Sequence, residues 1–101
     1  MQQYNDILSV IIKIAGEIGH ENGIHKLSAA NADTILYGTG GSLDSLMLVR
    51  LLAETEEEIF NVFGKEIIIA DERAMSQKHS PFRSVGSLAE YIEKLLSESD
   101  E

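Results

Sequence analysis

Apolar residues recur at helical spacing in three separate segments of this chain, and this pattern limits its possible folds more than any other feature. Each stripe is wide enough to pack one face of a helix against a core. The stripes consist of Ile7, Ile11, Ile14 and Ile18; Leu48, Leu51, Leu52, Thr55, Ile59 and Phe63; and Leu88, Tyr91, Ile92, Leu95 and Leu96. With one short helix added, they predict an all-α fold, a small four-helix bundle in a single domain of residues 1–101.

Capping residues set the expected ends of these helices. The first helix should run over residues 5–22, with Asn5 or Asp6 as its N-cap and Gly23 as its stop. Glycines within it, Gly16 and Gly19, weaken the helix or bend it. The second should run over residues 45–63, between an Asp44 cap and Gly64. The last should begin near Ser87, where Ser87-Leu88-Ala89-Glu90 has the pattern of a capping box.

The connecting segments differ in character. Residues 25–44 are expected to form a long loop with a short turn between Asn31 and Leu36, held to the core by residues 35–37. The isoleucines of residues 67–69 should form an extended connection that packs into the core. Asp71 should cap a short helix over residues 72–75, and a loop should follow over 77–81. The core spans about residues 5–96, and residues 97–101 form an acidic tail.

Charge and composition exclude several functions. Asp and Glu total 17 against 8 Lys and Arg, a net charge of −9. Such a surface repels nucleic acids and anionic membranes and attracts basic protein patches. The chain has no cysteine, which excludes disulfides and thiolate chemistry. It shows no membrane-spanning apolar run and no basic signal-peptide start, so we expect a cytoplasmic protein without membrane insertion.

The residues needed for metal binding or hydrolysis are not arranged in recognisable motifs. The three histidines, His20, His25 and His79, lie outside any metal-ligand spacing. Residues 56–58 are consecutive glutamates, whose side chains diverge around a helix and do not converge on one ion. The glycines before Asp44 lack the Lys-Ser/Thr ending of a phosphate loop. We therefore predict neither a metal site nor an enzyme.

One serine stands out at the start of the second helix. Gly40 and Gly41 lead to Asp44-Ser45-Leu46, which places the Ser45 hydroxyl at an exposed helix start beside a carboxylate. Nothing near it in sequence supplies the base that a nucleophilic serine needs. A serine of this kind is either an ordinary first-turn residue or a residue that other enzymes modify.

The helices, the long first loop and the exposed serine follow one another in an order that resembles the acyl carrier protein family. Members of this family are the phosphopantetheine-carrying domains of fatty-acid, polyketide and peptide synthesis. The resemblance covers residues 7–96, and its most specific part is Asp44-Ser45-Leu46. Further support comes from residues 56–60, Phe63-Gly64 with Ile67, and residues 87–92. The resemblance implies an acyl-carrier type of four-helix bundle with a long first loop.

The resemblance also implies a function. Ser45 would carry 4′-phosphopantetheine, transferred from coenzyme A by a separate phosphopantetheinyl transferase. The arm would hold an acyl or aminoacyl group as a thioester and present it to loading and processing enzymes. We expect a monomer that would meet these partners through residues near Ser45, namely Asp44, Leu46, Met47, Val49, Arg50, Glu54 and Glu57.

Two positions depart from the family pattern. Carriers of primary fatty-acid synthesis usually have acidic residues where this chain has Met47 and Arg50. This difference suggests a carrier dedicated to a specialised biosynthetic pathway. The alternative function is an unmodified helical module for protein interaction, which would use the same bundle and the apolar strip of Leu46, Val49 and Ala53.

Overall fold

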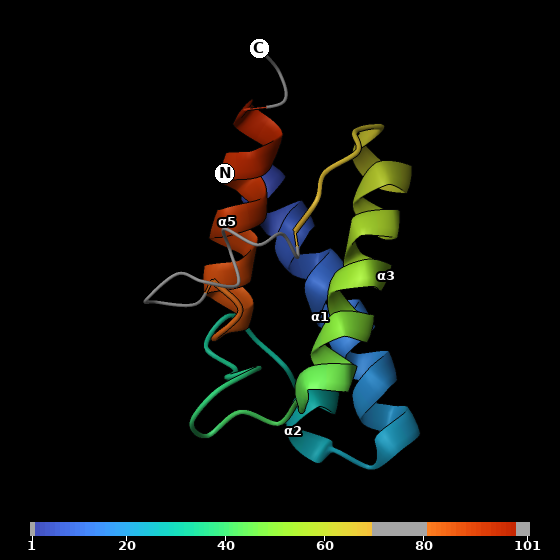
Figure 1. Ribbon diagram of the computed structural model, residues 1–101, viewed down its shortest axis with the longest axis vertical. Coiled ribbons are helices and arrows are strands. Elements are labelled where there is room, and N and C mark those ends of the chain that lie inside the picture. Colours follow the sequence, from blue (N-terminus) through green and yellow to red (C-terminus); the bar gives the residue numbers. More distant parts are fainter. Residues whose placement is uncertain (1, 70–80, 99–101) are drawn as a thin grey trace.

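The computed structural model describes residues 2–69 and 81–98, and within these ranges the regular structure is entirely helical (Figure 1). The helices are α1 (Gln2–Asn22), α2 (His25–Ser28), α3 (Ser45–Phe63) and α5 (Val85–Glu98). The described ranges contain no strand, only an isolated antiparallel bridge between Ile35 and Ser84. The prediction of a small all-helical bundle is confirmed for this part of the chain.

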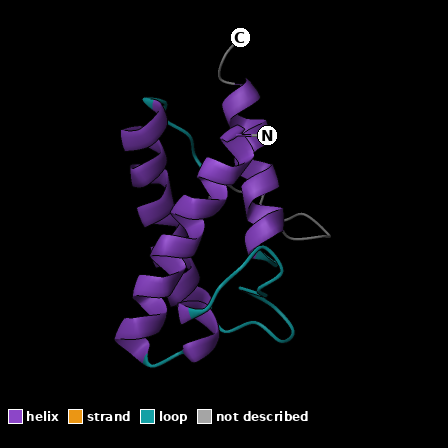
Figure 2. Cartoon of the chain, turned by 180° about the vertical axis from the view of Figure 1, so that it is seen from behind, coloured by secondary structure: helices purple, strands orange, loops and turns teal. Residues whose placement is uncertain are grey.

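Helix α1 is the centre of the bundle. The other three helices pack against it, and α1 passes between α3 and α5 in both views (Figures 1 and 2). The loop of residues 29–44 lies beside the N-terminal ends of α5 and α3 (Figure 1). The core is mainly aliphatic and includes most of the predicted stripes of all three long helices, whereas Tyr91 and Leu95 of the α5 stripe are half-buried against it. Its fully buried large side chains include Ile7, Ile11, Ile18, Leu48, Leu51, Leu52, Ile59, Phe82, Leu88 and Ile92.

The start of α1 and the segment after it differ from expectation. Because α1 begins at Gln2, Asn5 and Asp6 lie inside the helix and neither is its N-cap. The helix ends at Asn22, before Gly23 with φ +68°, as predicted. The expected loop from residue 25 instead starts with α2, whose Leu27 is fully buried. The burial of Leu27 stabilises this helix. With four residues, the helix is too short for its sequence to show an apolar stripe.

Helix α3 has the predicted bounds. Asp44 is its N-cap, and Gly64 at φ +71° ends it, donating its N–H to Phe60 O at 2.8 Å. Its predicted core face is buried, except that Phe63 is only half-buried. Both ends of α3 are therefore fixed by residues whose conformational preferences are strong.

One polar group in the α3 core face lacks a partner. The Thr55 side chain is fully buried, and its Oγ1 has no hydrogen-bond partner among the described residues. We expect Thr55→Val to raise the free energy of unfolding by about 1 kcal/mol, because valine has the same shape without the desolvated hydroxyl. Urea denaturation measures the change in the free energy of unfolding.

Thr34→Val is the matched control. It should destabilise the protein, since Thr34 Oγ1 accepts the Asn31 N–H at 2.9 Å. A loss of stability in Thr55→Val would contradict the expectation.

The isoleucine segment is extended, as expected, but only part of it enters the core. Ile69 is fully buried and Ile67 is half-buried, whereas Ile68 is 69% exposed. The prediction was wrong for Ile68, because side chains of an extended segment alternate between core and solvent. The Ile69 N–H donates to the Glu56 carboxylate at 2.6 Å, which holds the segment against α3.

Helix α5 begins at Val85, two residues earlier than predicted, and its capping box is shifted by three residues. The Ser87 N–H donates to Ser84 Oγ at 3.1 Å, and the Ser84 N–H donates to Ser87 Oγ at 3.0 Å. Ser84 is thus the cap, and the prediction that Ser87 and Glu90 form the box was wrong. Ser87 takes the part that glutamate usually plays.

Three predictions concern residues outside the described ranges, wholly or in part. The short helix expected over residues 72–75 lies outside them, and so does the loop expected over residues 77–81 except for Pro81, which lies in a turn. The acidic tail was expected from residue 97, but α5 continues to Glu98, and only residues 99–101 lie outside.

Candidate functional site

Ser45 is the first residue of α3, and its side chain is exposed. The preceding Asp44 has an extended backbone (φ −87°, ψ 178°), and its carboxylate accepts the Met47 N–H at 2.8 Å. The Asp44 carbonyl accepts the Leu48 N–H at 2.9 Å, the first bond of the helix. Asp44 therefore fixes the start of α3 and leaves the Ser45 hydroxyl accessible from solvent.

The N-terminus of α3 also presents backbone hydrogen-bond donors beside Ser45. The first N–H groups of an α-helix have no intrahelical acceptor. The Asp44 carboxylate accepts the Met47 N–H, whereas the N–H groups of Ser45 and Leu46 have no acceptor among the described residues. These two donors and the positive end of the helix dipole lie beside the Ser45 hydroxyl, an arrangement that favours an anionic group attached there.

The loop before Ser45 is held in place by the core. Leu36 is fully buried and Leu43 nearly so, and the Leu43 N–H donates to Leu36 O at 2.9 Å. Gly41 fits closely inside this loop, because a Cβ there would lie 2.7 Å from Leu36 O. The Leu36 N–H donates to Arg83 O at 2.6 Å, just before α5. The position of Ser45 thus depends on both α3 and the start of α5.

A tyrosine from this loop meets Ser45. The Tyr37 hydroxyl lies 3.3 Å from Ser45 Oγ, within hydrogen-bond distance, and either oxygen can donate. Tyr37 is half-buried and packs against the core. The sequence predicts only an anchoring role for residues 35–37 and does not indicate this contact. No sequence signal marks it, because it depends on how residues 38–44 fold.

The apolar residues predicted to meet partner proteins differ in their exposure. Leu46 is 80% exposed and Val49 54%, and Ala53 continues this strip along α3. Met47 is different, since it is half-buried and packs against the core. The strip therefore presents apolar side chains within two turns of Ser45, while Met47 contributes mainly to stability.

Arg50 is exposed but paired with two carboxylates. Its Nε donates to Glu54 at 2.6 Å, and its Nη2 donates to Glu21 of α1. The hydrogen bond with Glu54, followed by that with Glu21, raises the pKa of the Arg50 guanidinium above its ordinary value. The three side chains together carry one negative charge, so Arg50 does not make this part of α3 basic.

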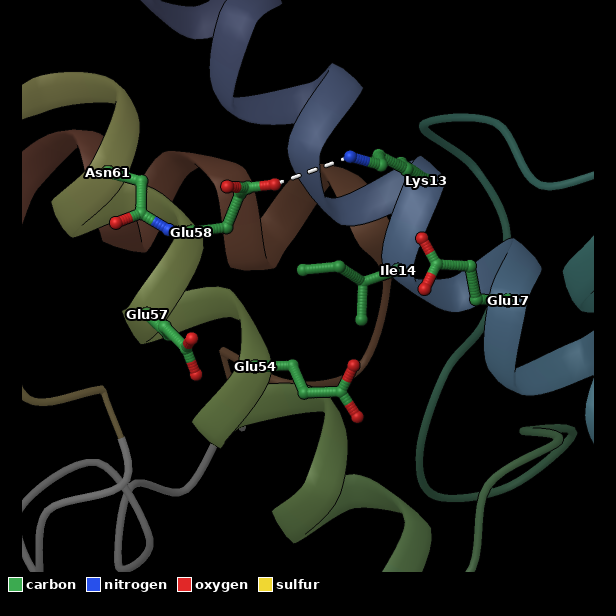
Figure 3. Close-up of a pocket in the computed structure, with 7 residues that line it drawn as sticks. All are labelled: Lys13, Ile14, Glu17, Glu54, Glu57, Glu58 and Asn61. Atoms are coloured by element: carbon green, nitrogen blue, oxygen red, sulfur yellow. Dashed lines mark hydrogen bonds and ion pairs between the residues drawn. The ribbon is translucent and has the colours of Figure 1, made fainter.

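Acidic side chains line a groove of about 310 Å³ between α1 and α3 (Figure 3). The carboxylates of Glu54, Glu57 and Glu58 come from α3 and that of Glu17 from α1. Lys13 Nζ also lines the groove and forms an ion pair with Glu58 Oε2 at 3.4 Å. Within the described residues, no three histidines, aspartates or glutamates are grouped so that they could hold a metal ion. The groove instead contributes negative potential to the side of α3 that Glu54 and Glu57 occupy.

Removal of the α3 cap should weaken the fold. We expect Asp44→Ala to lower the free energy of unfolding by about 1 kcal/mol, because the Met47 N–H loses its acceptor. Asp44→Asn is the control, since asparagine caps equally well without the charge. Chemical denaturation of the three proteins measures the difference. Equal stability of Asp44→Ala and the unaltered chain would contradict this role for Asp44.

Comparison of the chain with protein-family models, curated proteins and solved structures gives no match. Among residues 2–69 and 81–98, no helix is long and apolar enough to cross a membrane.

Proposed function

We propose that this chain is an acyl carrier protein whose Ser45 carries a 4′-phosphopantetheine arm. The observation that carries the proposal is the exposed Ser45 hydroxyl at the first position of a capped helix, on a loop anchored to the core. A group attached there extends into solvent, while its attachment point keeps a fixed position. Both properties are needed by a protein that delivers a bound intermediate to several enzymes.

The surroundings of Ser45 suit a phosphodiester. The N–H groups of Ser45 and Leu46 and the positive end of α3 favour its negative charge. The Tyr37 hydroxyl supplies a further donor within reach of Ser45 Oγ. The adjacent Asp44 is an anion, and its carboxylate is already engaged by the Met47 N–H. The residues present therefore fit the group.

Attachment is a phosphoryl transfer from coenzyme A. Ser45 Oγ forms a bond to the phosphorus nearer the pantetheine, and the bridge between the two phosphates breaks. Adenosine 3′,5′-bisphosphate leaves, and the hydroxyl proton passes to a base of the transferase, which also holds the Mg²⁺. The chain itself provides only the hydroxyl and its position.

Once attached, the arm supplies a terminal thiol that holds an acyl or aminoacyl group as a thioester. The tether raises the concentration of that group near any enzyme docked on the chain. The exposed strip of Leu46, Val49 and Ala53 offers such an enzyme an apolar contact next to Ser45. The acidic groove beside it attracts basic patches, so docking should weaken as salt concentration rises.

The absence of cysteine makes the proposal easy to test. We expect no reactive thiol in the unmodified chain and one per chain after incubation with coenzyme A, Mg²⁺ and a broad-specificity phosphopantetheinyl transferase. A thiol-reactive dye measures this after free coenzyme A is removed. A folded chain that gains no thiol, and that carries no arm beforehand, would favour the unmodified interaction module.

A further inference from the structure

We infer that Tyr37 is a positioning residue for the modification of Ser45, an inference that rests on the proposed function. Its hydroxyl lies 3.3 Å from Ser45 Oγ, although the two residues are eight positions apart. Ser45 is exposed and stands at a helix start, where little else restricts its side chain. Among the described residues, the Tyr37 hydroxyl is the side-chain group within hydrogen-bond distance of Ser45 Oγ, and it thus selects one orientation of this oxygen.

Tyr37 is itself held firmly enough for this role. Its ring is half-buried and packs against the core. The Tyr37 N–H donates to Arg83 O at 3.4 Å, and the neighbouring Leu36 N–H donates to the same oxygen. Gly41 packs so closely that a Cβ there would lie 2.8 Å from Tyr37 Cα. A hydroxyl on such a support has a fixed position relative to α3.

The direction of the hydrogen bond follows from the chemistry. Ser45 Oγ must lose its hydrogen to the base of the transferase while it bonds to phosphorus. The reactive arrangement is therefore the one in which Tyr37 donates and the Ser45 hydrogen points away. In the product, the former hydroxyl oxygen is an ester oxygen without hydrogen, so Tyr37 can only donate, either to it or to an adjacent phosphate oxygen. A donor to an anionic oxygen forms a stronger bond than a donor to a neutral one.

Tyr37→Phe tests this role because the ring and its packing remain. In the full-length chain we expect kcat for transfer to fall about fivefold, the equivalent of one ordinary hydrogen bond, while KM changes by less than about twofold. The ³¹P resonance of the modified protein should also shift relative to the unaltered chain. Tyr91→Phe is the control, since the buried Tyr91 hydroxyl has no partner among the described residues, and it should leave all these values unchanged.

A second measurement needs no transferase. In the unmodified chain, Hα–Hβ couplings of Ser45 should report one dominant side-chain rotamer, and in Tyr37→Phe they should report averaging over several. A wild-type transfer rate, an unshifted ³¹P resonance and unchanged couplings in Tyr37→Phe would overturn the inference while leaving the carrier function intact. Failure of the unaltered chain to accept the arm would instead overturn the proposed function, and the inference with it.

Discussion

Ser45→Ala is expected to abolish the gain of a thiol completely while leaving the fold intact. The variant lacks the only atom to which the phosphorus can bond at this position. Because Ser45 is exposed, its replacement should change the free energy of unfolding by less than about 0.5 kcal/mol. Thiol labelling and urea denaturation, performed on the same preparation, measure the two effects.

Ser42→Ala is the matched control for this experiment. Ser42 lies three residues earlier in the same loop and is half-buried, so it lacks the exposed position at the helix start. This variant should be labelled to the same extent as the unaltered chain. Labelling of Ser45→Ala, or its loss in a folded Ser42→Ala, would contradict the assignment of Ser45 as the attachment point.

Gly19→Ala is expected to destabilise the bundle by about 1–3 kcal/mol, the range typical of overpacked cores. A Cβ at Gly19 would lie 2.6 Å from Leu27 Cβ and 2.8 Å from Ile24 O, where α2 packs against α1. The Ile24 N–H donates to Gly19 O at 2.8 Å, so the backbone at this turn has little freedom to move away. Thermal or chemical unfolding measures the loss.

The same helix provides a control of opposite sign. Gly16 lies one turn earlier, and the nearest atom to a Cβ there is Leu27 O at an ordinary 3.9 Å. Gly16→Ala should therefore stabilise the protein by about 0.5–1 kcal/mol through helix propensity alone. Stabilisation by both alanine variants would contradict the inference that α2 packs too closely against Gly19 to admit a Cβ.

The sequence allowed the long helices and the presented serine to be predicted, because each is specified locally. Asp44 and Gly64 delimit α3, and the apolar stripes identify the core faces. The missed features depend on contacts between distant residues. Helix α2 exists because Leu27 packs against Gly19, and Arg50 meets Glu21 from another helix. Local patterns carry no information on such pairs.

The start of α5 illustrates a different limit. Ser87 and Glu90 match the usual capping-box pattern, whereas the observed pair, Ser84 with Ser87, has its spacing but not its usual Glu or Gln. The loop decides between them. Thr34 O accepts the Val85 N–H at 3.0 Å, and Ile35 forms a β-bridge with Ser84. These contacts fix the backbone at Ser84, immediately before the first residue of α5. The same tertiary pairing holds Tyr37 near Ser45, which explains why that contact was also missed.

The central claim, that Ser45 carries phosphopantetheine, is tested most directly by mass spectrometry. The intact mass should increase by one phosphopantetheine unit after incubation with coenzyme A, Mg²⁺ and the transferase. Fragmentation of the digested protein should locate the added mass on Ser45, in the peptide that contains Asp44 and Leu46. An unchanged mass in a folded, initially unmodified sample, or an added mass on a different serine, would contradict the claim.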